Sequence, residues 1–146
     1  MLSKILVDTI ISNCTSETEN CGANLAKQLR NGDFIALFGD LGAGKTAFIR
    51  GLCSVLVPDV ETYSPTYSII NEYIGKDITV YHMDAYRISS DDDLESIGFY
   101  DYRDAVIACE WYENIPFALP KTYYSVTIIG SGDIPRKIVI EKVENK

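Results

Sequence analysis

One short segment of the chain has the residue types and the spacing of a phosphate-binding loop. It matches the pattern G-x-x-x-x-G-K-[ST] in full, with the residues Gly39, Asp40, Leu41, Gly42, Ala43, Gly44, Lys45 and Thr46. A polyphosphate needs several converging backbone N–H donors, and glycines let a chain wrap that closely. We expect Lys45 to reach the β- and γ-phosphates and the Thr46 hydroxyl to bind Mg²⁺. The segment therefore predicts binding of a nucleoside triphosphate together with Mg²⁺.

Two acidic residues stand where such a loop needs them. Glu110 directly follows a continuous apolar run, and Asp84 directly follows a second strand candidate. Acids at neighbouring strand ends are required because the metal ion and the attacking water must be held opposite the phosphates. We therefore predict Lys45, Asp84 and Glu110 as catalytic residues, and Thr46, Asp84 and Glu110 as the metal-binding set. Which of the two acids contacts the metal directly stays open.

The elements around the loop have the order that this motif requires. An apolar run at 34–38 lies between turn residues, which is typical of a buried parallel strand. A helix with an apolar face is expected from about Lys45 to Leu56. A strand, a glycine-rich turn and a helix in succession would place the loop at the helix N-terminus, where the dipole and free N–H groups favour an anion.

The rest of the chain predicts alternating strands and helices. A helix is expected from Ser16 as N-cap, with Glu19 completing a capping box, to about Arg30. A second helix should begin at the acidic residues 91–93 and end near Gly98. Further strands are expected at 2–12, 68–73, 78–83, 105–109, 124–129 and 138–142. The turns at 74–77 and 130–133 would join their flanking strands into hairpins.

These elements predict an α/β chain with a three-layer fold of the P-loop NTPase type. We expect a largely parallel central sheet with antiparallel hairpin strands added to it. The length of 146 residues suits one domain spanning residues 1–146, and it contains no linker long enough to separate a second.

Charge and composition exclude several classes of protein. The formal net charge is −8, so the chain lacks the basic face of a protein that binds nucleic acid alone, and a nucleic-acid role should go through partners. No stretch approaches the ~20 apolar residues of a membrane helix. Asp8 interrupts the first apolar run and no small-residue cleavage site follows, so we expect a cytoplasmic protein without a membrane role.

The cysteines do not predict a metal site. Four cysteines form no C-x-x-C pair and the chain has one histidine, so no structural zinc site is expected. We expect buried free thiols in a reducing compartment.

The motifs that follow the loop resemble those of a known family. They are Ser64-Pro65-Thr66-Tyr67, Asn71-Glu72-Tyr73, His82-Met83-Asp84-Ala85-Tyr86-Arg87 and Glu110-Trp111. With the loop, their order and spacing resemble the TsaE (YjeE) family of small bacterial P-loop ATPases needed to make threonylcarbamoyladenosine in tRNA. The resemblance spans almost the whole chain.

The resemblance implies an activity and partners. The resemblance implies that the protein binds ATP and Mg²⁺, hydrolyses ATP slowly and works with TsaD and TsaB. It would reach tRNA only through that complex, and ATP hydrolysis would reset the complex between rounds. On the matching positions, Lys45 and Thr46 would hold phosphate and metal, and Asp84 and Glu110 would be the acids. Thr66 would belong to a loop that senses the γ-phosphate, and Thr15 and Ser16 would lie close to the adenine.

A few residues depart from the family pattern or have two interpretations. Ala47, included in the cofactor-binding set, stands where the family often has a second Thr, and the tail around Arg136 diverges most, so no nucleotide role is assigned to Arg136. His82, Trp111 and Arg87 are each either packing or surface residues or members of the site.

Two other functions remain open. A small-molecule kinase would use the same fold, although no cluster of arginines suited to a kinase lid occurs among the arginines of the sequence. A nucleotide-dependent adaptor would bind ATP without hydrolysing it. Neither alternative accounts for the motifs that follow the loop. The absence of D-x-x-G and [NT]-K-x-D patterns makes a Ras-like GTPase a poor fit.

Overall fold

The computed structural model describes residues 2–40, 43–60, 70–99 and 104–145. Within them, seven strands form one sheet in the order β1-β7-β6-β2-β5-β4-β3. The strands are β1 (Leu2–Ser12), β2 (Phe34–Gly39), β3 (Ile70–Ile74), β4 (Thr79–Asp84), β5 (Val106–Glu110), β6 (Thr122–Ile129) and β7 (Arg136–Asn145). The helices are α1 (Thr15–Ala26), α2 (Lys45–Leu56), α3 (Asp91–Ser96) and the short 3₁₀ helices η2 (Tyr112–Asn114) and η3 (Pro116–Ala118).

The centre of the sheet is parallel and its margins are antiparallel. Strands β6, β2, β5 and β4 run parallel to one another. Antiparallel pairing joins β3 to β4, β7 to β6, and β1 to β7. The predicted fold class and both predicted hairpins are therefore confirmed.

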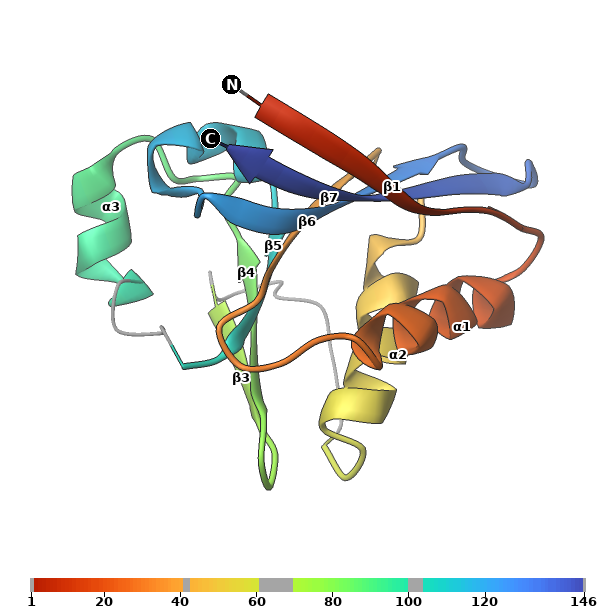
Figure 1. The fold of residues 1–146 in the computed structure, drawn as a ribbon, viewed down its shortest axis with the longest axis horizontal. Helices are drawn as coiled ribbons and strands as arrows, with labels where there is room; N and C mark the ends of the chain where they lie inside the picture. The colour runs from red at the N-terminus through yellow and green to blue at the C-terminus, as the bar shows by residue number, and fades with distance from the viewer. Residues whose placement is uncertain (1, 41–42, 61–69, 100–103, 146) are drawn as a thin grey trace.

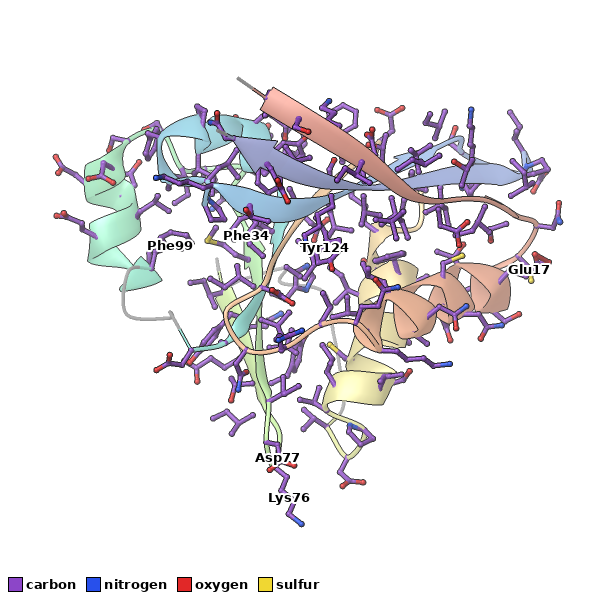
Figure 2. The ribbon with its side chains drawn as sticks, in the orientation of Figure 1. Glu17, Phe34, Lys76, Asp77, Phe99 and Tyr124 are labelled. Carbon is purple, nitrogen blue, oxygen red and sulfur yellow. The ribbon has the colours of Figure 1, made fainter. Side chains whose placement is uncertain are left out.

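Helices cover the sheet on both faces (Figure 1). Helices α1 and α2 lie together on one face, where apolar side chains such as Phe48 and Leu52 of α2 pack on Ile35 and Val126 of the sheet. Helix α3 and the 3₁₀ helices lie toward the other face, in a smaller cluster that includes Phe34 and Phe99. Figure 2 shows these two rings on that side of the sheet. Each buried strand thus has apolar residues facing both layers, which explains the unbroken apolar runs in the sequence.

Helix α1 differs from its prediction at both ends. The N-cap is Cys14 rather than Ser16, and its side chain makes no capping hydrogen bond. Glu17, not Glu19, reaches back to accept from the backbone N–H of Asn13 at 3.3 Å, while Glu19 pairs with Arg50 at 3.0 Å. The predicted capping box at Ser16 and Glu19 was therefore wrong, because Glu19 is drawn to the neighbouring helix.

The same helix also ends earlier than predicted. It stops at Ala26 instead of about Arg30, and the backbone N–H groups of Gln28 and Leu29 bond in tight i→i−3 turns. Leu29 remains buried although it has left the helix. Leu25 and Leu29 are therefore both buried, as their spacing of four predicted, although the chain leaves the helix between them.

The last strand is longer than predicted because of a partner far away in sequence. Strand β7 pairs along its length with β1, from Arg136 opposite Ser12 to Asn145 opposite Leu2. The first and last strands therefore close one margin of the sheet, and both termini lie near each other (Figure 1). At the opposite margin, Lys76 and Asp77 lie at the tip of the β3–β4 hairpin (Figure 2).

Candidate functional site

The phosphate-binding loop connects β2 to α2 as predicted. Gly44 is the N-cap of α2 with a φ of 111°, a left-handed conformation that favours glycine, and its carbonyl accepts from Phe48 to begin the helix. Ala43 is buried, and its N–H donates to the carbonyl of Asp40 at 2.9 Å. This part of the loop is held at the N-terminus of a helix, where an anion is stabilised.

Some predicted residues lie outside the described part of the chain. They are Leu41 and Gly42 of the loop and the whole Ser64–Tyr67 motif with Thr66. Their proposed contacts with a nucleotide stay predictions.

Three charged or titratable side chains form a chain of contacts beside the loop. Lys45 Nζ lies 3.5 Å from Glu110 Oε1, and His82 Nε2 lies 2.6 Å from Glu110 Oε2. Glu110 is 8% exposed and His82 is fully buried. The structure thus brings Lys45 and Glu110 together, and it places the buried His82 in hydrogen-bond contact with the same carboxylate.

Sheet register explains why these residues meet. Glu110 lies opposite Asp84 on β4 and opposite Leu37 on β2, so the acids share the carboxyl edge of parallel strands. Side chains alternate along a strand, so Val80, His82 and Asp84 lie on one face. Val80 packs in the core beneath α2, which places His82 on the side of Glu110 and Lys45. This alternation was the signal by which the sequence could have predicted the contact.

The charges around Glu110 keep it ionised. Burial acts to raise the pKa of Glu110, but the hydrogen bond from His82 and the charges of His82 and Lys45 outweigh it, and the net pKa is lowered. A carboxylate only accepts, so Nε2 of His82 carries the hydrogen in this contact. Nδ1 of His82 is buried and has no hydrogen-bond partner within the described residues.

The oxygen donors near the loop fit a magnesium ion. Thr46, half-buried, is the second residue of α2, and Asp84 and Glu110 end neighbouring strands. Hydroxyl and carboxylate oxygens are the donors that Mg²⁺ prefers. Asp84 Oδ1 also accepts from the N–H of Tyr86 at 2.9 Å, which orients this carboxylate. No group of three or more His, Cys, Asp and Glu side chains that could hold a metal ion is found among the described residues.

Trp111 lies where the loop and the strand end meet. Its φ is 60°, and its ring packs edge-on against Tyr86 with centroids 4.9 Å apart. Lys45 Nζ lies 5.7 Å from the centre of the same ring. Lys45, Trp111 and Glu113 line a cavity of about 260 Å³ with the end of β2. Trp111 therefore borders the cavity beside Lys45, and Arg87 is an exposed residue.

A second cavity, of about 310 Å³, lies on the other side of the loop. Its walls come from the start of α1, the loop and the β6–β7 turn, with the residues Ser12, Asn13, Cys14, Thr15, Thr18, Ala43, Gly44, Ala47, Gly132, Asp133, Ile134 and Arg136. Thr15 and Ala47 line this cavity and Ser16 does not, and the predicted binding of a cofactor by these residues stays a prediction. Cys14 is exposed here, so the expectation of buried thiols holds only for Cys21, Cys53 and Cys109.

Arg136, for which no nucleotide role was predicted, contacts the loop. Its Nε donates to the carbonyl of Ala43 at 3.0 Å, and its terminal nitrogens donate to the carbonyls of Gly132 and Ile134. The side chain thus joins the β6–β7 turn to the phosphate-binding loop across 93 positions of sequence. No local pattern could have predicted that contact.

The chain matches a family of known proteins. A family model described as threonylcarbamoyl adenosine biosynthesis protein TsaE matches residues 12–138. The chain belongs to the TsaE family. The matched region contains the loop, both acids and His82, and it ends at β7 just beyond Arg136.

Individual TsaE proteins are similar over most of their length. The tRNA threonylcarbamoyladenosine biosynthesis protein TsaE of Treponema pallidum is 37% identical over 132 residues, which cover 89% of this chain and 97% of the relative. The TsaE of Bacillus subtilis is 36% identical over 132 residues, covering 89% and 82%. The crystal structure of B. subtilis YdiB superposes with a TM-score of 0.75 at 29% identity, covering 97% of this chain and 86% of that one. The structural match therefore extends over nearly the whole chain, and the family match extends from residue 12 to residue 138.

Proposed function

We propose that this TsaE-family protein is a Mg²⁺-dependent ATPase that acts in the biosynthesis of threonylcarbamoyladenosine in tRNA. Its relatives in T. pallidum and B. subtilis carry the name of that pathway. The observation that supports an ATPase most directly is the contact chain Lys45–Glu110–His82 beside the phosphate-binding loop. In this contact chain the Lys45 ammonium can bind phosphate oxygens, and the ionised Glu110 carboxylate can accept a hydrogen bond from a water molecule.

Each residue has a role that follows from its position. Backbone N–H groups at the start of α2 and the Lys45 ammonium would bind the phosphates. Lys45 would then exchange its contact with Glu110 for the phosphates, which leaves a Glu110 oxygen free to accept from the attacking water. His82 would hold the other oxygen in place. We assign the water-positioning role to Glu110 because Asp84 Oδ1 already accepts from Tyr86.

The metal would be bound by the Thr46 hydroxyl with the help of Asp84, while Glu110 would position the water. Mg²⁺ supplies charge neutralisation at the β- and γ-phosphate oxygens when it is bound. The cavity lined by Thr15 and Ala47 has room for the nucleoside, and its position beside Gly44 would let the phosphates reach the helix N-terminus.

The partners we propose are TsaD and TsaB, with tRNA reached only through their complex. The net charge of −8 favours a role without direct contact with RNA. Hydrolysis by the isolated protein would be slow and would reset the complex between rounds. None of the helices within the described ranges is long and apolar enough to cross a membrane.

The test is phosphate release from Mg-ATP by the protein alone and with purified TsaD and TsaB, with Lys45→Ala as the control. We expect a low rate alone, a higher rate with the pair, and loss of both in the variant. A phosphorylated acceptor without free phosphate would identify a kinase instead. Tight ATP binding without turnover, even with the pair present, would identify an adaptor.

A further inference from the structure

We propose that Arg136 is a positioning residue that sets the direction of a phosphate-binding N–H group in the loop. The inference rests on the proposed nucleotide binding and extends it to a residue on the antiparallel margin of the sheet. Its basis is the hydrogen bond from Arg136 Nε to the carbonyl of Ala43, 3.0 Å long.

The peptide unit between Ala43 and Gly44 explains how a contact with a carbonyl can act on phosphate. This unit is trans, as are all peptide bonds of the described chain. In a planar trans peptide the C=O and the N–H point in opposite directions. Because Arg136 binds the Ala43 carbonyl on the side of the β6–β7 turn, the N–H of Gly44 must point away from that turn, across the loop.

A cation is well suited to hold this orientation. A hydrogen bond from a guanidinium to a carbonyl is stronger than one between neutral groups, and it polarises the whole peptide unit. The Gly44 N–H becomes a better donor to an anion as a result. The φ of Gly44, 111°, is a left-handed conformation that glycine adopts at little cost, so the direction of its N–H depends on what holds the preceding carbonyl.

The β6–β7 turn is built to present the guanidinium. Besides Ala43, Arg136 donates to the carbonyls of Gly132 at 3.0 Å and of Ile134 within its own turn. Gly130, with a φ of 119°, leaves room for the arm of Arg136, because a Cβ at this position would lie 3.3 Å from Arg136 Cδ and 3.0 Å from the Pro135 carbonyl. The guanidinium therefore reaches the loop from a fixed turn.

The test separates this role from direct contact with the nucleoside, which the same cavity would allow. Mg-ADP and inorganic tripolyphosphate are titrated into the wild type, Arg136→Lys and Arg136→Ala, with binding measured by calorimetry. The matched control is Lys137→Ala, which removes one exposed cation from the neighbouring position of the same strand. Thermal unfolding checks that each variant is folded, and Arg136→Lys preserves the charge if Arg136→Ala does not fold.

We expect both Arg136 variants to bind Mg-ADP and tripolyphosphate about tenfold more weakly, the size of one charge-assisted hydrogen bond, with the same factor for both ligands. Lysine should not rescue binding, because its single ammonium cannot span the loop and the turn. In the ligand-free protein, the amide resonance of Gly44 should shift in Arg136→Lys and stay in place in Lys137→Ala.

Other outcomes would overturn the inference. Loss of Mg-ADP binding with unchanged tripolyphosphate binding would place Arg136 on the nucleoside instead. Unchanged binding of both ligands would leave Arg136 as a brace of the turn only. If the wild type binds neither ligand, the proposed nucleotide-binding function is wrong. That result comes from the wild type alone, so it is distinct from any effect of the Arg136 variants.

Discussion

The two sides of the phosphate-binding loop are built in opposite ways. On the side proposed for the phosphates, the buried Glu110 contacts both Lys45 and His82, and Glu110 and His82 come from adjacent parallel strands. On the side proposed for the nucleoside, the cavity is lined by residues at the start of α1, several of them exposed, and by the β6–β7 turn. The central strands fix charged groups to within hydrogen-bond distance, whereas the second side needs only shape and room.

This difference predicts that substitutions beside Glu110 should lower the rate of hydrolysis, whereas substitutions in the cavity beside Thr15 should lower the affinity for the nucleotide. Buried charges on neighbouring strands cannot move without breaking the sheet, so they suit groups that must be placed accurately in a transition state. Exposed residues at a cavity rim, such as Thr15, tolerate replacement more readily, whereas Arg136 of the turn is tied to the loop by its hydrogen bond to Ala43. Each prediction below tests one side against the other.

The largest effect should come from Glu110→Ala. We expect turnover of Mg-ATP to fall about a hundredfold or more, the usual cost of losing a general base, while ATP binding is retained. Glu113→Ala is the control, because Glu113 lines the phosphate-side cavity and is exposed. Single-turnover phosphate release and calorimetry measure the two quantities. An unchanged rate in Glu110→Ala would remove Glu110 from the reaction.

A smaller effect should come from filling the nucleoside side with Thr15→Phe. Thr15 is exposed at the first position of α1, so a larger ring can be accommodated without disturbing the core. We expect Mg-ATP to bind about tenfold more weakly, the loss of about 1.4 kcal/mol of contacts, while tripolyphosphate binds as before. Asn20→Phe, exposed on the same helix but outside the cavity, is the control. Equal loss for both ligands would mean that the two sides are not separate.

Acid should weaken the phosphate side first. The folded-state pKa of Glu110 lies below the usual 4.5, so its ionised form stabilises the fold at higher pH, and this contribution is lost as pH falls from about 4.5 through the lowered value. Urea unfolding of the wild type and Glu110→Gln at several pH values measures it. The wild type should lose more stability than the variant over that acidic window. If the free energy of unfolding changes with pH equally in the wild type and in Glu110→Gln, the contacts of Glu110 with His82 and Lys45 do not stabilise the fold.

The smallest effect concerns the thiols. Burial raises the pKa of Cys53 to about 12 and also raises that of Cys109, whereas Cys14 is exposed on the nucleoside side. A thiol reagent should therefore modify Cys14 first in the folded protein, and Mg-ADP should slow that reaction. Cys14→Ser is the control that should lose the fast phase. If Mg-ADP does not change the rate at which Cys14 is modified, the nucleoside binds elsewhere.

Local patterns predicted much of this molecule because each depends on neighbours in sequence. The loop, the helix from Lys45 to Leu56 and the hairpins follow from glycine spacing, periodicity and turn residues, and the structure has them. The capping box at Ser16 failed because its acid, Glu19, found Arg50 on another helix. Local rules hold until a partner from elsewhere competes.

The sequence by itself determined the chemistry that is available: a phosphate-binding loop with Lys45 and Thr46, and an acid after each of two apolar strands. The tertiary structure decided which groups meet. His82 and Glu110 lie 28 positions apart, and Arg136 and Ala43 lie 93 apart. Such contacts depend on strand order, register and which face of a strand points toward α2. These properties are set by burying the whole sheet between two helical layers, and no segment carries them alone.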